Sequence, residues 1–459
     1  MVLNASVLQH DVVGRVHRLG HMNAAHQSPA TLIDTHPPAE QSGPAAPWRA
    51  MAAGGGLLDA CGGFRSTIFD ETSALAARHE AINLGQGFPD QDGPAHMVAA
   101  AHRALDAGLN QYTPAVGSPR LRKAIADQQE RTQGRILDPE TQVLVTVGAA
   151  EGLTAALLSV VRAGDDVVVL EPYYDLYAAV VSFIGATLRT IPLRPPHFRP
   201  EAQDIHNAFS SRATAVLLND PHNPTGTVLA PDDARLIAQL AVEHDAVIIT
   251  DEVYEHLRFV GNHVSVAATN NRSLLGSEPA DLTLAHQVAE RTLVVSSASK
   301  TLRATGWRIG WVTGPGHLII GVRAVKTYLT HSPAAPLQDA VAAGLEDSCQ
   351  WVRDLATEQG ERSRMVAETL HELGLSVAEP CGSYYVVADF SPLYQRWGVS
   401  DSTELAAALI ERAGVALLPI SAFASPVNAG LYDGWMRVAA CKQTATLEQA
   451  MQRLRKHLQ

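Results

Sequence analysis

The sequence predicts an α/β protein whose larger part is built on a mainly parallel sheet. Short apolar runs, rich in valine, isoleucine and leucine, alternate with stretches of helical periodicity, and this alternation is typical of repeated β–α–β units. The runs that we expect to form strands are 143–147, 166–170, 213–219, 246–250 and 293–295. Polar residues follow several of them directly, and ligands of open α/β sheets bind beyond the carboxyl ends of the strands. The sequence therefore predicts a binding site along one edge of a sheet.

The helices expected around these strands have recognisable starts. Pro94 and Pro119 suit the first turn of helices over 94–108 and 118–132, and Ser118 suits the cap position. The C-terminal third mixes expected strands and helices, which predicts a smaller α+β domain. Its strands are expected near 384–389, 415–418 and 436–440, and its helices near 402–413 and 446–457. Residues 261–291 are polar and irregular, so we expect a surface insertion there.

The composition limits the classes of protein to consider. The 459 residues are 46% hydrophobic and 18% charged, as in a globular protein, and the net charge of −12 argues against a general nucleic-acid binder. The four cysteines are far apart and form no Cys-x-x-Cys pair, which indicates a reducing compartment; they are Cys61, Cys349, Cys381 and Cys441. No apolar run reaches the roughly 18 residues of a membrane span, and no secretory signal is evident. We expect a cytoplasmic protein.

Residues 1–56 differ in composition from the rest of the chain. Prolines and other turn formers are frequent, periodicity is weak, and the segment ends in Gly54-Gly55-Gly56. We expect a mostly disordered extension. Its five histidines match no template of metal-ligand spacing, so we expect no metal site. Translation starting at Met51 remains an alternative.

Chemistry concentrates around Lys300. It comes just after the apolar run 293–295, Ser297 lies three residues before it, and Arg308 lies eight residues after it. An amine, a hydroxyl and a guanidinium placed together suit a ligand with a carbonyl carbon and a phosphate, such as pyridoxal phosphate (PLP). The chain has only five lysines, and none of the other four follows an apolar strand into a turn of small polar residues. The alternative is a buried lysine at a strand end with Arg308 as a surface charge.

The segment Ser297-x-x-Lys300 with Arg308 resembles the cofactor-anchoring motif of class I, fold-type I, PLP-dependent aminotransferases. The resemblance is strongest to the branch of kynurenine/glutamine transaminases, methionine aminotransferases and N-succinyldiaminopimelate aminotransferases. It implies a seven-stranded type of sheet between helices, with Lys300 as the Schiff-base lysine and Ser297 and Arg308 as phosphate ligands. It also implies four segments in order along the chain. These are an N-terminal extension (1–56), an arm that joins the small domain (57–93), a large PLP-binding domain (94–330) and a small domain (331–459).

Further motifs extend the resemblance around the cofactor. The turn Gly148-Ala149-Ala150 opens a helix and offers backbone N–H groups to the phosphate. Tyr174 is in register to stack on the pyridine ring, with Tyr173 as the second choice. Asn223 in Asn-Pro-Thr-Gly and Tyr254 are implied to bind the phenolic oxygen of the cofactor. Asp251, at the end of an apolar strand, is implied to keep the pyridine nitrogen protonated. Each residue taken singly also has a plain structural explanation, as a turn, a cap or core packing.

Substrate and partner residues are implied in the same way. Gly87, in Gly-Gln-Gly-Phe-Pro, is implied to let the backbone approach the substrate carboxylate, and Arg437 and Asn223 to bind the substrate. The alternative for Arg437 is a salt bridge within the protein. Tyr112 is implied to reach the cofactor phosphate of a neighbouring subunit, which predicts a homodimer.

These motifs predict an aminotransferase that moves an amino group from an L-amino acid to a 2-oxo acid through Lys300. A PLP-dependent β-lyase or oxidase on the same scaffold remains an alternative, and analysis of the products distinguishes them. A non-enzymatic sensor domain is disfavoured because residues 1–56 show no basic helix-turn-helix. The sequence departs from the resembled branch at Ser299, at Leu302-Arg303 and at His331. We hypothesise that Arg303 or His331 alters the substrate pocket. The sequence leaves the amino donor and acceptor open.

Overall fold

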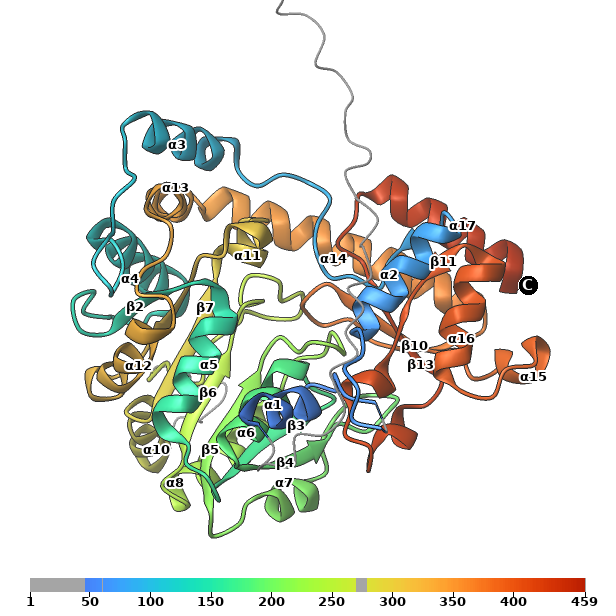
Figure 1. The fold of residues 1–459 in the computed structure, drawn as a ribbon, viewed down its shortest axis with the longest axis horizontal. Coiled ribbons are helices and arrows are strands. Elements are labelled where there is room, and N and C mark those ends of the chain that lie inside the picture. Colours follow the sequence, from blue (N-terminus) through green and yellow to red (C-terminus); the bar gives the residue numbers. More distant parts are fainter. Residues whose placement is uncertain (1–45, 60, 270–278, 459) are drawn as a thin grey trace, which may run out of the picture. The chain divides into compact units, whose positions relative to one another are not determined.

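A computed structural model describes residues 46–59, 61–269 and 279–458 (Figure 1). Most of the expected N-terminal extension, residues 1–45, lies outside the described residues. Its last part is a correction to the expectation of disorder, because Pro47–Gly54 form helix α1. Proline occupies the first turn of this helix, and a side chain at Gly54 would collide with Ala178 and Ser182 of helix α6 (Asp175–Ile184). The glycine-rich end of α1 is typical of a linker in sequence, but in the structure it allows the helix to pack closely on α6.

The central sheet has seven strands in the order β2-β8-β7-β6-β5-β3-β4. Their bounds are Val143–Thr146 (β2), Asp166–Glu171 (β3), Thr187–Pro192 (β4), Ala213–Asn219 (β5), Val247–Asp251 (β6), Thr292–Ser297 (β7) and Gly310–Thr313 (β8). β8 runs antiparallel to β2 and β7 on its two sides, and the other neighbouring pairs are parallel. The prediction of a mainly parallel sheet is confirmed. The strands β4 and β8 were not foreseen, since β4 is half-exposed and polar and β8 is short.

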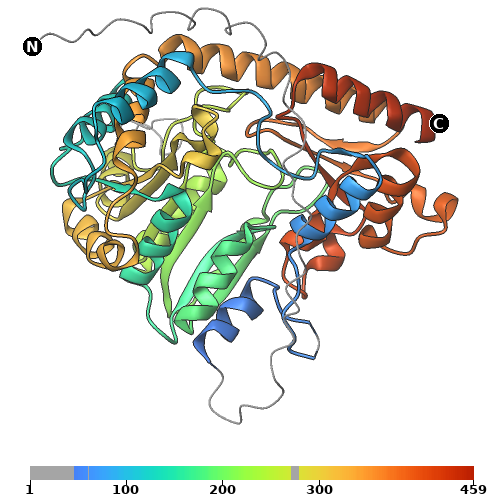
Figure 2. The same ribbon diagram turned by 45° about the horizontal axis from the view of Figure 1, so that its top comes forward.

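Helices cover both faces of this sheet, as Figures 1 and 2 show. Alternate residues of β3 point to opposite faces, so that Val167 and Val169 pack in one apolar cluster and Val168 and Leu170 in another. The first cluster includes α6, α5 (Gly148–Val160) and α12 (Gly316–Leu329), and the second includes α7 (Ala202–Ala208), α8 (Pro231–Glu243) and α10 (Pro279–Ala289). A further layer packs α3 (Ala95–Asp106), α4 (Pro119–Gln133) and α13 (Ala335–Glu346) together.

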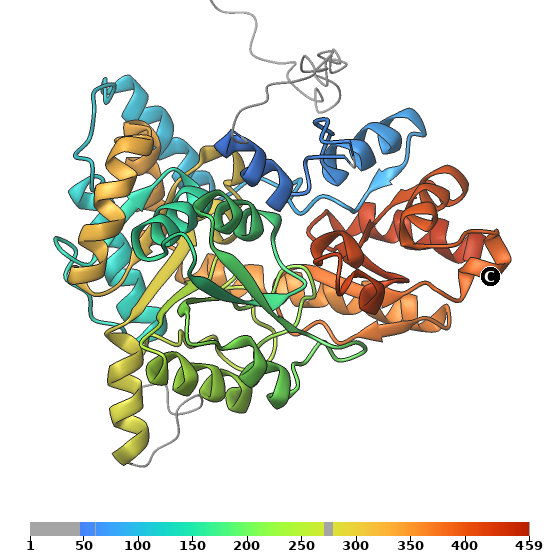
Figure 3. The ribbon, with the colours of Figure 1, turned by 60° about the horizontal axis from the view of Figure 1, so that its bottom comes forward.

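The C-terminal part is built on a four-stranded antiparallel sheet in the order β12-β13-β10-β9. These strands are Ser376–Ala378 (β9), Tyr385–Asp389 (β10), Leu418–Pro419 (β12) and Trp435–Ala439 (β13). The helices around them are α14 (Cys349–Glu372), α15 (Leu393–Trp397), α16 (Ser402–Ala408) and α17 (Thr444–Leu458). The N-terminal segment joins this part, because β1 (Ile82–Asn83) pairs in parallel with β11 (Val415–Ala416). Figure 3 shows α2 (Ile68–Arg78), in light blue, beside these red elements.

Residues 261–269 correct the expectation of a surface insertion. Four residues of this segment are buried, so it packs into the interior and is not a surface insertion; they are His263, Ser265, Ala267 and Ala268. Polar residues of this kind are typical of surface segments, but here the side chains of His263 and Ser265 bond to the buried Glu252. Residues 270–278 lie outside the described part of the chain. None of the described helices is long and apolar enough to cross a membrane.

Candidate active site

One cavity of about 240 Å³ collects most of the residues singled out from the sequence. It lies beyond the carboxyl ends of β5, β6 and β7, and β13 contributes a side chain from the other sheet. The predicted residues that line it are Gly87, Ala149, Ala150, Tyr174, Asn223, Asp251, Tyr254, Ser297, Lys300, Arg308 and Arg437. Phe69 and Tyr385, which the sequence analysis did not single out, line it as well.

Lys300 reaches the cavity from the one-turn helix α11 (Ala298–Thr301), which follows β7 directly. The hydroxyl of Ser297 caps this turn by accepting a hydrogen bond from the N–H of Ser299. Lys300 Nζ donates to Tyr384 Oη at 2.8 Å and to the carbonyl of Gly87 at 3.3 Å. Burial lowers the pKa of Lys300 to about 8, against the opposing effect of Asp251. The neutral, nucleophilic fraction of this amine near neutral pH is therefore much larger than that of an ordinary lysine, although the protonated form still predominates.

Asp251 ends β6 and is almost fully buried. Burial raises the pKa of its carboxyl to about 6, although a hydrogen bond from Tyr177 Oη at 2.7 Å partly offsets this. Asn219, on the neighbouring strand, donates to the carbonyl of Asp251 and accepts from the N–H of Asn223. The two strand ends therefore hold Asp251 and Asn223 in a fixed relation. Among the described residues no cation lies at hydrogen-bond distance from this buried carboxylate, which suits a protonated ring nitrogen.

The opposite end of the cavity suits a phosphate. Helix α5 begins at Gly148, so the N–H groups of its first turn have no partners within the helix. These N–H groups, together with the helix dipole, favour the binding of an anion. The guanidinium of Arg308 lies so close that a side chain at Gly148, where φ is +72°, would meet its Nη2 at 2.3 Å. Together with the Ser297 hydroxyl, these donors provide charge and hydrogen bonds for a dianion.

Arg437, on β13, is 1% exposed and has no ion pair with a carboxylate within the described residues. It donates to Asn223 Oδ1 at 3.0 Å and to the carbonyl of Gly85 at 2.8 Å, while its Nε has no partner. The rings of Tyr385 and Phe423 lie 4.2 and 4.5 Å from the guanidinium. A buried guanidinium needs an anion, so an external carboxylate fits here better than the alternative of an internal salt bridge.

A protein-family model described as "Aminotransferase class I and II" matches residues 79–454. The chain belongs to this family. It is 44% identical over 400 residues to the probable N-succinyldiaminopimelate aminotransferase of Mycobacterium tuberculosis, covering 85% of this chain and 96% of that protein. It is 36% identical to the methionine aminotransferase of Escherichia coli, covering 85% and 95%. The solved structure of the Mycobacterium tuberculosis enzyme superposes with a TM-score of 0.77, covering 85% of this chain and 96% of that one.

This class I/II aminotransferase uses pyridoxal phosphate to transfer amino groups. Its cavity fits that cofactor on three counts. The absence of a side chain at Gly148 lets the Arg308 guanidinium approach the start of α5, the donors near Ser297 and Arg308 match a phosphate, and the Nε of Arg437 is left for a further anion. The fold-type I architecture expected from the sequence is confirmed as well.

Several singled-out residues lie away from the cavity. Tyr112 is 87% exposed and packs edge-on against His331 at 5.5 Å between ring centroids. Arg303 is paired with Glu358 at 3.2 Å and lies over Trp351, and neither Arg303 nor His331 lines the cavity. Of the two neighbouring tyrosines considered for stacking on the ring, Tyr173 packs in the core and Tyr174 lines the cavity.

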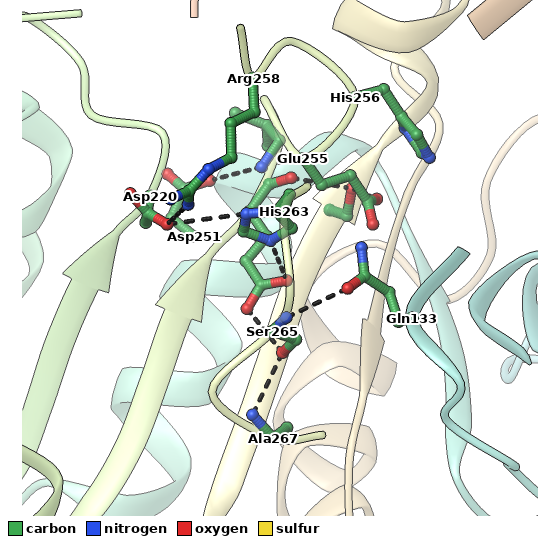
Figure 4. A network of polar contacts seen from close by, with 12 residues as sticks. Gln133, Asp220, Asp251, Glu255, His256, Arg258, His263, Ser265 and Ala267 are labelled. Atoms are coloured by element: carbon green, nitrogen blue, oxygen red, sulfur yellow. Dashed lines mark hydrogen bonds and ion pairs between the residues drawn. The ribbon is translucent and has the colours of Figure 1, made fainter. Parts of the chain in front are cut away.

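A buried polar network supports the strand ends from behind (Figure 4). His263 Nε2 lies 3.0 Å from Glu252 Oε2, and its Nδ1 lies 3.6 Å from Asp220 Oδ2. Glu252 follows Asp251 directly and Asp220 follows Asn219, so this imidazole connects the ends of β6 and β5. Burial by itself lowers the pKa of His263, but the two carboxylates outweigh it and raise the pKa to about 10.

The network predicts a pH-dependent contribution to stability. His263 faces Glu252, Asp220 and, beyond Asp220, Arg258. Since the pKa rises from 6.5 to about 10 on folding, the stabilisation is complete below the lower value and is lost as pH rises through the upper one. We expect His263→Gln to lower the free energy of unfolding of the cofactor-free aminotransferase at pH 7 by about 3 kcal/mol, since it removes the cation beside the buried Glu252 and leaves Asp220 only its 3.4 Å contact with Arg258.

The measurement is urea unfolding at neutral pH and above about pH 10. The gap between wild type and His263→Gln should narrow at the higher pH, while the exposed control His206→Gln should match wild type throughout. A gap that stays constant with pH would show that His263 is not charged in the folded protein.

Proposed function

We propose that this aminotransferase converts L-amino acids and 2-oxo acids with Lys300 as the residue that holds the cofactor and moves the proton. The observation that carries the proposal is the convergence of Lys300, Asp251 and Arg437 on one cavity, each from a different strand end or sheet. An amine, a buried carboxylate and a buried guanidinium without a counter-ion are the groups that amino transfer requires. No two of them lie close together in the sequence.

The cofactor would be held at each of its polar groups. Gly148, Ala149, Ala150, Ser297 and Arg308 would bind the phosphate. Asp251 would pair with the ring nitrogen, Asn223 and Tyr254 with the ring oxygen, and Tyr174 would pack against the ring. When bound, pyridoxal phosphate supplies an aldehyde carbon that reacts with amines and a ring that accepts the electron pair left at a substrate carbon.

Lys300 would carry the proton transfers. Its Nζ removes the proton from the Cα of the amino acid, and it returns a proton to that carbon position when a 2-oxo acid is converted in the reverse direction. Burial supports this role, because the pKa of Lys300 is lowered to about 8 and the amine acts as a base near neutral pH.

Arg437 would bind the α-carboxylate that all the substrates share. The nearby Gly87 supports this, because a side chain there would meet Tyr385 Oη at 2.0 Å and block the approach of a substrate. Two relatives are named a probable N-succinyldiaminopimelate aminotransferase and a methionine aminotransferase. The amino acids in these names, methionine and the amino form of the N-succinyl compound, are therefore the first amino donors to test.

A homodimer completes the proposal. Tyr112 is exposed in the single chain, and Ile320, Tyr328 and Leu329 of α12 are also exposed, at 71%, 92% and 47%. Such an apolar surface favours association with a second copy, which would deliver Tyr112 to the partner's phosphate site. We also propose a cytoplasmic location, which is supported by four free cysteines. The division into a large domain 94–330 and a small domain 331–459 with arm 57–93 stays part of this proposal.

The proposed function predicts that the reaction with an amino donor requires Lys300. Mixing the yellow holoenzyme with an amino donor should bleach the absorbance of the bound cofactor and release one equivalent of 2-oxo acid, whereas Lys300→Ala should do neither at a comparable rate. Lys326, a fully buried lysine that does not line the cavity, provides the control Lys326→Met. Release of ammonia in place of a new amino acid would instead identify a lyase or an oxidase.

The second prediction concerns Arg437. Arg437→Gln should lower kcat/KM by about 100-fold or more, mainly through KM, because the charge-assisted bonds to the carboxylate are lost. Steady-state kinetics with several donors should give a similar loss for each of them, since all share the α-carboxylate. The surface control Arg455→Gln should match wild type. A loss confined to one donor would assign Arg437 to a side chain and not to the carboxylate.

The third prediction concerns the partner subunit. Sedimentation of the holoenzyme should show a dimer, and Tyr112→Phe should weaken the affinity for pyridoxal phosphate by about 10-fold without changing the dimer, because one hydrogen bond to the phosphate is removed. A wild-type monomer with full activity would refute the shared site.

A further inference from the structure

Tyr384 forms hydrogen bonds with Lys300 and Gly87 that have no role in the proposed function so far. It immediately precedes β10, is 2% exposed, and its hydroxyl lies between Lys300 and the carbonyl of Gly87. The hydroxyl donates to Gly87 O and, at 2.8 Å, accepts a hydrogen bond from Lys300 Nζ. Tyr384 and Lys300 are separated by 84 residues in the chain, so no local sequence motif predicts their contact.

The hydrogen bonds of Lys300 occupy two of the three free positions on its nitrogen. Within the described part of the chain, Nζ has two acceptors, Tyr384 Oη and Gly87 O. A neutral amine has two N–H groups and one lone pair, so both N–H groups are bonded and the lone pair stays free. An ammonium ion at the same place has three N–H groups, and the third would point where the lone pair of the amine does, away from these two acceptors.

The acceptors themselves are held in place. The Tyr384 ring packs edge-on against Tyr254 and Tyr385, with centroids 5.1 and 4.8 Å apart. A side chain at Gly87 would come within 3.0 Å of the Tyr384 ring, so the glycine allows this close approach. Burial raises the pKa of the Tyr384 phenol well above its usual value, so the phenol keeps its proton and remains a donor to Gly87.

We propose that Tyr384 is a further catalytic residue, which together with the Gly87 carbonyl holds the released Lys300 amine with its lone pair free to take the proton from the substrate Cα. The proposal rests on the proposed role of Lys300. In the step it serves, the Cα–H bond breaks, the proton forms a new N–H bond at Nζ, and the electron pair of the broken bond passes to the cofactor ring.

The test in the holoenzyme is Tyr384→Phe, which removes the hydroxyl and keeps the ring. We expect the half-reaction with an amino donor to slow by about 10- to 100-fold and the deuterium isotope effect at Cα to increase, because proton transfer becomes more limiting. The dissociation constant of the donor should change by less than about threefold, since Arg437 still binds the carboxylate.

Tyr432→Phe is the matched control, since Tyr432 is also fully buried and its hydroxyl also donates to a backbone carbonyl, that of Glu171. It should leave the rate and the isotope effect as in wild type. Equal losses in the two variants, or a loss of donor affinity in Tyr384→Phe with an unchanged isotope effect, would overturn the proposal.

A second readout uses the cofactor-free protein. Acetylation of lysines at a series of pH values, followed by peptide mass spectrometry, measures the titration of Lys300 separately from the other four lysines. In Tyr384→Phe we expect its midpoint to fall, because the lost acceptor stabilises the ammonium ion more than the amine. An unchanged midpoint would overturn the contact. If the wild-type holoenzyme failed to react with any amino donor, the proposed function would fail while this titration still tested Tyr384.

Discussion

The structure depends on a local imbalance of charge around one cavity. Lys300, Arg308 and Arg437 line it, and Asp251 is the carboxylate that lines it with them. Arg437 is buried without an anion among the described residues, which is costly unless a ligand supplies one. The phosphate that we propose beside Arg308 and the carboxylate that we propose beside Arg437 would restore the balance. On this proposal, the charges that attract an anionic cofactor and anionic substrates are already present in the fold before any ligand binds.

The scaffold maintains this imbalance by joining distant segments rigidly. Parallel strands bring Asn223, Asp251 and Lys300 to one edge of the large sheet, because the carboxyl ends of β5, β6 and β7 are neighbours. Behind that edge, His263 connects two of these strands through buried carboxylates. Arg437 arrives from the smaller sheet and is connected to the larger one by its bond to Asn223. A relative shift of the two sheets would therefore change the distance between the substrate carboxylate and the reacting amine.

The sequence was informative wherever function follows from position along a strand. Asp251 and Lys300 could be predicted because a polar residue after an apolar run lies at a strand end in any open α/β sheet. Tyr177 and Tyr384 could not be predicted in this way. Their hydroxyls reach Asp251 and Lys300 across 74 and 84 residues, and only the packed positions of α6 and β10 bring them there. Helix α1 and the buried segment around His263 were misjudged because glycine and polar residues are typical of linkers and surfaces, whereas here they serve close packing and an internal network.

The most direct test of this account is chemical and locates the cofactor on the chain. Borohydride reduction of the holoenzyme, followed by proteolysis and mass spectrometry, should place the pyridoxyl group on the peptide that contains Lys300. The other four lysines, Lys123, Lys326, Lys442 and Lys456, should remain unmodified. A pyridoxyl group on any of these four, or a protein that takes up no pyridoxal phosphate before reduction, would contradict the account.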